Sequence, residues 1–160
     1  MARQVRLAKE QIQHLQTTTA EEDQRRKRQA TIDFYMATAK QVAEWREQLP
    51  DDWDSVGIGR VVTEAYDTRN RRAIRRNQRT KRLIASYLGF FETIAVAEKM
   101  NIYELETLDA IAGSRLINIS TNYGLFFKKR REEVGTASAY EHVERLGQKI
   151  SELPTRRRHP

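Results

Sequence analysis

The chain has 160 residues, no cysteine and a formal net charge of +7, with 32% charged and 39% hydrophobic residues. This length suits one domain, or one domain with an extended arm, and is sufficient to bury a hydrophobic core. The absence of cysteine excludes disulfides and thiolate metal sites, and it fits a reducing compartment such as the cytoplasm.

The first 50 residues predict two helices. Apolar residues at Val5, Ala8, Ile12 and Leu15 recur every three or four positions, which indicates a short amphipathic arm over residues 1–19. We expect Thr17–Thr19 to interrupt it and a capping box of Thr19 and Glu22 to start a second helix over residues 20–48. The expected apolar face of that helix is Ile32, Tyr35, Met36, Ala39, Val42 and Ala43.

The central part of the chain has no proline between Pro50 and Pro154 and no strand-like alternation, so the sequence predicts an all-α fold. Asp54 or Ser55 is expected to cap a short helix after Pro50. A strong helix follows over residues 83–100, with Asn101 at its C-terminal end. A long helix over residues 103–133, which Gly113 could bend, would then fold back to complete an antiparallel hairpin.

The last part of the chain shows Ser138 and Glu141 at capping-box spacing, which predicts a final helix over residues 138–150. Residues 151–160 form a basic tail that we expect to be disordered. The sequence therefore predicts an arm (1–19), a helical domain (20–150) built as a bundle on the hairpin, and a tail (151–160).

The net positive charge is traced to one segment, residues 69–82. The remainder has 21 basic residues (29 less 8) against 22 acidic ones. The segment either extends the next helix or is a mobile connection, and it could bind nucleic acid, an acidic membrane surface or an acidic protein, or be only a solvated charged face. The candidate anion-binding residues are Arg69, Arg71, Arg72, Arg75, Arg76, Arg79, Lys81 and Arg82.

Targeting signals are not evident. Residues 1–16 contain several charges and lack the apolar run of a signal peptide. The most apolar stretch, residues 83–97, is shorter than the roughly 20 residues that a transmembrane helix needs. We therefore expect a cytoplasmic protein, with peripheral membrane contact as an alternative.

Three segments resemble a bacterial family of unknown function, the DUF4760 family: residues 28–34 (RQATIDF), 87–104 (YLGFFETIAVAEKMNIYE) and 138–144 (SAYEHVE). The resemblance spans most of residues 25–147 and implies a helical fold with no assigned reaction. It also implies an N-terminal transmembrane helix in many members, which the Val5–Leu15 stripe does not match. Relatives often carry Asn three residues before the glutamate at position 92, where this chain has Gly89.

Two lone charges in apolar sequence, Glu92 and Arg115, are the candidates for a buried ion pair. Glu92 could alternatively be a general acid or base. The three histidines are scattered and show no metal-ligand spacing, the acidic loop around Trp53 lacks an EF-hand pattern, and no nucleophile set or phosphate loop is recognisable.

The sequence thus favours a non-enzymatic helical interaction module without cofactor, metal or small-molecule substrate. Its Val5–Leu15 stripe would serve self-association into a homo-oligomer. The alternative is a binder of an anionic surface through residues 69–82, and an enzyme that uses Glu92 is the last choice.

Overall fold

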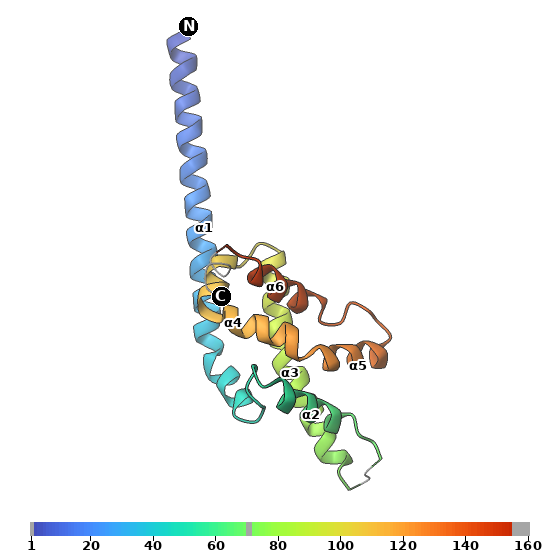
Figure 1. Ribbon diagram of the computed structural model, residues 1–160. Coiled ribbons are helices and arrows are strands. Elements are labelled where there is room, and N and C mark those ends of the chain that lie inside the picture. The colour runs from blue at the N-terminus through green and yellow to red at the C-terminus, as the bar shows by residue number, and fades with distance from the viewer. Residues whose placement is uncertain (1, 70–71, 155–160) are drawn as a thin grey trace.

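The computed structural model describes residues 2–69 and 72–154, without the side chains of residues 2–5 and 8. Over these residues the chain is all-α, as the sequence predicts. The described helices are α1 (Ala2–Arg46), α2 (Ser55–Ala65), α3 (Ile74–Lys99), α4 (Leu105–Asn122), α5 (Gly124–Val134) and α6 (Glu141–Ser151). Figure 1 shows a body made of α2–α6 and the second half of α1, from which the first half of α1 projects alone.

Helix α1 is continuous over 45 residues, so the predicted interruption at Thr17–Thr19 is wrong. The three threonine hydroxyls donate to backbone carbonyls four residues earlier, at 2.8–2.9 Å. A threonine can satisfy its hydroxyl in this way inside a helix, and Thr19 therefore forms no capping box with Glu22. The arm and the next predicted helix are one element, roughly 68 Å long at about 1.5 Å per residue.

The second half of α1 packs against α3 and α4 through a face that matches the predicted one only at Tyr35 and Val42. Ile32 and Met36 are exposed, whereas Phe34, Tyr35 and Trp45 are half-buried against the core and Val42 is buried. The Phe34 ring stacks on Phe90 of α3, with 5.7 Å between the ring centroids. The face is set by these aromatic rings, which lie on a side of the helix where the sequence also carries threonines.

The start of α2 confirms one of two predicted caps. The Asp54 side chain accepts a hydrogen bond from the Gly57 backbone N–H at 2.8 Å, which satisfies an otherwise free donor of the first turn. Helix α2 then buries Ile58, Val62 and Ala65 against the body.

The link between α3 and α4 is a tight turn at Asn101. Asn101 adopts the left-handed conformation (φ 61°), its N–H donates to Glu98 O, and the Ile102 N–H donates to Ala97 O. This pair of bonds is a Schellman motif, and it confirms Asn101 as the end of the helix. After the turn, α4 makes its most extensive contacts with α6, and fewer with α3.

The predicted long helix over residues 103–133 is two helices, which meet at Tyr123 and not at Gly113. Tyr123 has φ −92° and ψ 10° and separates α4 from α5, while Gly113 lies inside α4. The Tyr123 ring is 1% exposed and lies 6.3 Å from the Tyr87 ring, centroid to centroid. The helix is therefore interrupted where a large side chain is held in the core.

Helix α6 covers α3 and α4. Gly147 allows this close approach, because a Cβ atom there would lie 2.2 Å from Ser120 Oγ and 2.8 Å from the Leu116 carbonyl oxygen. The predicted capping box at its start is wrong: the Ser138 hydroxyl bonds to Thr136, and Tyr140, with φ 61°, precedes the first turn. The tail residues 155–160 lie outside the described residues.

The core is one cluster shared by all these helices, with large side chains from α3, α4, α5 and α6 at its centre. They include Tyr87, Phe91, Leu116, Ile119, Phe126, Phe127, Val143 and Ile150. In the part of the chain that the structure describes, no helix is both long and apolar enough to cross a lipid bilayer.

Candidate anion-binding face

The basic segment is helical from Ile74 onward, because α3 begins there and runs through Arg82. The structure thus selects the helical alternative for residues 74–82. Arg71 lies outside the described residues, and Arg69 precedes the helix. Asn77 is buried and its side-chain amide donates to the Asp67 carbonyl oxygen at 2.9 Å, which attaches the start of α3 to the end of the α2 segment.

The exposed side chains at the start of α3 are almost all basic. Of residues 72–82, the exposed ones are five arginines and one glutamine: Arg72, Arg75, Arg76, Gln78, Arg79 and Arg82. Arg75, Arg79 and Arg82 follow one another at spacings of four and three, so they lie on one side of the helix. None of these three forms an ion pair with a residue that the structure describes.

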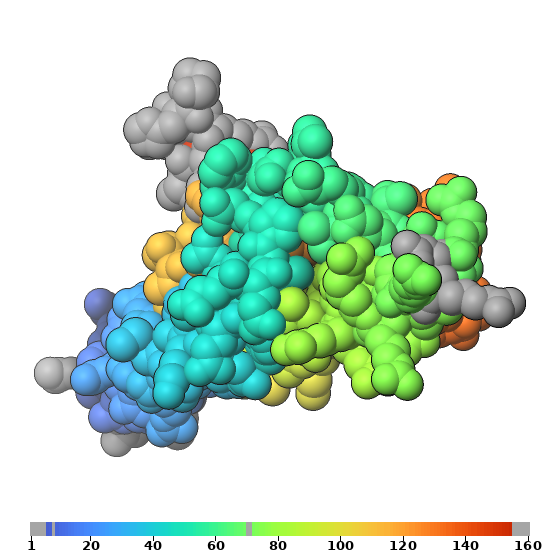
Figure 2. All heavy atoms as spheres, turned by 90° about the horizontal axis from the view of Figure 1, so that it is seen from below, coloured from blue at the N-terminus to red at the C-terminus, as the bar shows by residue number. Residues whose placement is uncertain are grey.

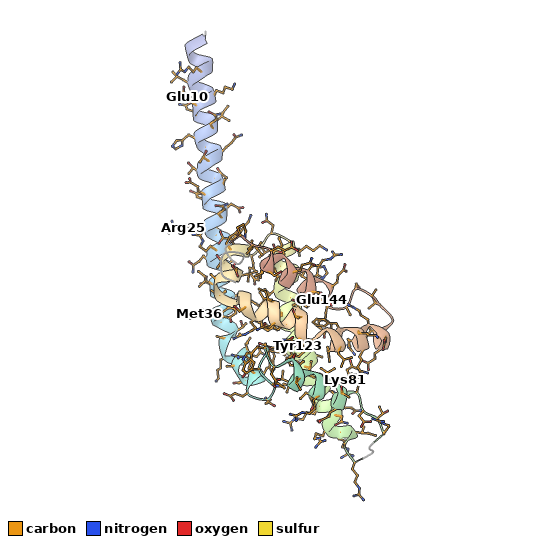
Figure 3. The ribbon with its side chains drawn as sticks, viewed as in Figure 1. Glu10, Arg25, Met36, Lys81, Tyr123 and Glu144 are labelled. Carbon is orange, nitrogen blue, oxygen red and sulfur yellow. The ribbon has the colours of Figure 1, made fainter. Side chains whose placement is uncertain are left out.

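Helix α5 adds cations beside this row. The Lys81 and Lys129 ammonium groups lie 4.5 and 5.4 Å from the centroid of the Tyr66 ring, so this ring is held between α3 and α5. Burial, and then the charge of Glu133, raise the pKa of the Tyr66 hydroxyl to about 12. Figure 3 shows Lys81 in this region, where the start of α3 meets the other helices.

A hollow of about 290 Å³ lies between the two helices, with Lys81, Arg82 and Arg130 around it and Ala85 and Phe126 at its apolar base. Glu133 pairs with Lys81 and Arg130, and these contacts lower the pKa of the Glu133 carboxyl below its ordinary value.

We give the name basic face to the exposed and half-exposed cations of residues 72–82 and of residues 128–130 in α5: Arg72, Arg75, Arg76, Arg79, Lys81, Arg82, Lys128, Lys129 and Arg130. In Figure 2 the start of α3 lies on the molecular surface beside α2, with α5 behind it. Arg69 lies at the edge and pairs with Asp67 at 3.1 Å. A bond from the Arg69 backbone N–H, and then one from its side chain, lower the pKa of the Asp67 carboxyl.

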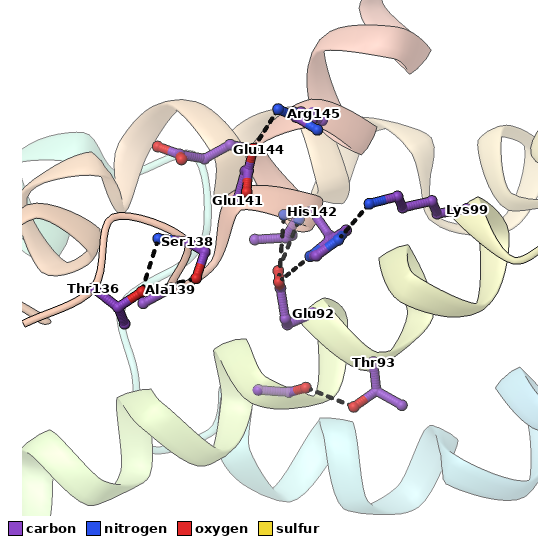
Figure 4. A network of polar contacts seen from close by, with 12 residues as sticks. Glu92, Thr93, Lys99, Thr136, Ser138, Ala139, Glu141, His142, Glu144 and Arg145 are labelled. Carbon is purple, nitrogen blue, oxygen red and sulfur yellow. Dashed lines mark hydrogen bonds and ion pairs between the residues drawn. The ribbon is translucent and has the colours of Figure 1, made fainter. Parts of the chain in front are cut away.

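The predicted pair of Glu92 and Arg115 does not form. Glu92 accepts hydrogen bonds from the Val143 N–H at 2.8 Å and the His142 N–H at 3.3 Å, and it contacts His142 Nδ1 at 2.8 Å (Figure 4). It therefore caps the first turn of α6 from another helix, in the place of the predicted serine. Both carboxylate oxygens are occupied by these bonds.

Arg115 instead contacts Asp52, a residue of the acidic loop around Trp53. The distance from Arg115 Nε to Asp52 Oδ2 is 3.5 Å, and Arg115 also donates to the Tyr35 hydroxyl at 3.0 Å. The Tyr87 hydroxyl donates to both Asp52 oxygens, at 2.9 and 2.7 Å, and Asp52 is 5% exposed. Burial raises the pKa of the Asp52 carboxyl, and the Tyr87 bond and the Arg115 charge oppose this effect.

Glu92 and Asp52 each attach one segment of the chain to another, and we call them the carboxylate anchors. Neither set of partners was predicted from the sequence. The lone cation in apolar sequence correctly indicated that Arg115 needs a carboxylate, but the partner lies 63 residues away, in a loop that is mostly acidic. Within the described ranges, no group of three or more His, Asp or Glu side chains is placed to hold a metal ion.

A sequence model of the family described as Domain of unknown function (DUF4760) matches residues 10–150. The chain belongs to this family. No curated protein and no solved structure matches the chain. In this DUF4760 chain the matched range includes the basic face and both carboxylate anchors, and it begins within the projecting half of α1.

Proposed function

We propose that this chain is a non-enzymatic helical interaction module of the cytoplasm that binds nucleic-acid phosphates through its basic face. The observation that carries the proposal is the composition of the exposed side of residues 72–82, which is arginine with one glutamine. Guanidinium groups bind phosphate oxygens in a bidentate manner. A helix that lies in a membrane surface has exposed apolar side chains to insert, and this side of α3 has none.

The test is binding to a fluorescent DNA duplex and to single-stranded RNA, measured by anisotropy over a range of salt concentrations. We expect the triple variant Arg75→Gln, Arg79→Gln, Arg82→Gln to bind more weakly. For duplex DNA, the slope of log K against log salt should fall by roughly 0.9 for each phosphate that the variant no longer neutralises.

The matched control is Lys9→Gln, Lys40→Gln, Arg25→Gln, which removes the same charge from exposed positions of α1. It should change the slope little. Equal weakening in the two triple variants would show that net charge, and not the basic face, produces the binding. Binding to acidic vesicles but to neither nucleic acid would reject the proposal in favour of a membrane surface.

Self-association is a second candidate, supported by the projecting half of α1. Ile12 and Leu15 are 55% and 65% exposed and share the predicted stripe, and Figure 3 shows the side chains around Glu10 with no other element beside them. A helix of this kind has no tertiary packing of its own to stabilise it. Pairing of two stripes would bury these side chains.

Sedimentation velocity tests this candidate. The change Leu15→Glu should convert an oligomer to monomer, because it places a charge in the stripe. Leu7→Glu is the matched control, since Leu7 is similarly exposed (52%) but lies outside the stripe. A wild-type chain that is monomeric at all concentrations would rule out self-association.

A further inference from the structure

A second charged site lies away from the basic face, where the end of α3 meets α6. A hollow of about 400 Å³ is lined there by side chains from both helices and from the turn between α3 and α4. Its lining includes three cations, one carboxylate and one imidazole: Lys99, Arg145, Lys149, Glu98 and His142. Ala95 and Leu146, both buried, give it an apolar base.

Glu98, the carboxylate of the lining, pairs with only one of the three cations there. Glu98 binds the Lys149 ammonium at 2.5 Å, so this pair contributes no net charge. The Arg145 guanidinium pairs with Glu141 through one nitrogen, and it has further N–H donors beyond that contact. Lys99 has no carboxylate partner among the described residues, and its ammonium contacts His142 Nε2 at 3.1 Å.

The network of Figure 4 holds Lys99 in place. An ionised Glu92 only accepts, so the 2.8 Å contact fits the His142 tautomer that carries its proton on Nδ1. Nε2 of the same ring then accepts from the Lys99 ammonium, which can only donate. Glu92 thereby fixes the imidazole, and the imidazole fixes the Lys99 ammonium at the edge of the hollow. Two of the three N–H donors of this ammonium remain for another acceptor.

We propose that this hollow binds the phosphate group of a small phosphate monoester. Lys99 and Arg145 supply charged donors from two helices, and charge-assisted bonds of this type are the strong ones. Asn101 adds an amide at the rim. The apolar base contributed by Ala95 and Leu146 lies beside the short carbon skeleton, so a monoester binds more tightly than inorganic phosphate.

The experiment is a titration of the full chain with inorganic phosphate and with glycerol 3-phosphate. Calorimetry measures the affinity, and the chemical shifts of the backbone amides locate the site. We expect the shifts to be confined to residues around Lys99, Asn101 and α6. The variants Lys99→Gln and Arg145→Gln should each weaken binding about tenfold, because each removes one charged donor. Lys40→Gln, an exposed lysine on α1, is the control and should leave binding unchanged.

A further arm identifies the carrier of the phosphate group. Vesicles of phosphatidylcholine with phosphatidic acid present a phosphate monoester on a lipid. If the chain bound these vesicles in a Lys99-dependent way but bound neither soluble phosphate, the ligand would be a lipid headgroup. The triple arginine variant of the basic face should bind glycerol 3-phosphate normally, which separates this site from the proposed function. Absence of binding to all three probes, or binding that Lys99→Gln and Arg145→Gln leave unchanged, would overturn the proposal.

Discussion

Asp52 and Glu92 are two carboxylates that attach distant segments to the body of the molecule in contrasting surroundings. The Asp52 side chain is 7% exposed and binds a hydroxyl and a guanidinium. The Glu92 side chain is 21% exposed and binds two backbone N–H groups and an imidazole. One joins the loop after α1 to α3 inside the core, and the other joins α3 to α6 near the surface.

The difference lies in how each charge is compensated. Burial removes water from Asp52, and its compensation comes from side chains that a single substitution can remove. Glu92 is compensated by the backbone of a helix start, whose N–H groups remain in place whatever the side chains are. We therefore expect the Asp52 anchor to be the more sensitive of the two to substitution of its partners.

The largest effect is predicted for Arg115→Met, which removes the cation beside Asp52 and preserves much of the side-chain volume. A buried carboxylate without its cation costs about 3 kcal/mol, so the free energy of unfolding in urea should fall by about that amount near neutral pH. Arg25→Met, on the exposed side of α1, is the control and should stay within about 0.5 kcal/mol of wild type. Equal effects of the two substitutions would contradict the role of Arg115.

The loss of stability in Arg115→Met should also depend on pH. The pKa of Asp52 in the folded chain is already above its ordinary value of 3.8. The folded state therefore binds the proton more tightly than the unfolded state, and this stabilising contribution is lost as pH rises through the folded pKa. Without Arg115 that pKa rises further, so the deficit of the variant should grow from about pH 4 toward neutral pH. A deficit that is constant across this range would show that altered packing, and not charge, is responsible.

The Glu92 anchor gives a smaller expected effect. Glu92→Gln retains one acceptor oxygen and removes the charge at the start of α6, which should lower the free energy of unfolding by about 1–2 kcal/mol. Amide exchange at His142 and Val143 should accelerate. Glu98→Gln, on the same helix, is the matched control: it breaks only an ion pair with an exposed lysine and should cost less than about 1 kcal/mol.

Local signals in the sequence predicted much of the helical framework. Asn101 ends α3 because its left-handed conformation closes two hydrogen bonds within six residues, and Asp54 caps α2 through a residue three positions on. Such features depend on neighbours along the chain. The exposed arginines of residues 72–82 were likewise recognisable from composition alone.

Other local signals failed because a competing partner was closer in space. The capping boxes at Thr19 and Ser138 have the correct spacing, but Thr19 donates to the preceding turn, and the helix that Ser138 would start is capped by Glu92 from 50 positions away. The acidic loop after Pro50 shows no local sign that Asp52 is buried, and only the three-dimensional fold brings Tyr87 and Arg115 to Asp52. Pairing over such distances leaves no periodic trace in one sequence.

The smallest effect on stability is predicted for His142→Ala. This substitution separates the contribution of the imidazole to the Glu92 anchor from that of the two backbone N–H groups. The substitution removes the imidazole but leaves the backbone N–H groups of residues 142 and 143, so the free energy of unfolding should fall by only about 0.5–1 kcal/mol. In the double variant with Glu92→Gln, the two effects should be less than additive, because both act on one carboxylate. If His142→Ala alone cost as much as Glu92→Gln, the imidazole and not the helix start would be the main partner of Glu92, and the comparison with Asp52 would be wrong.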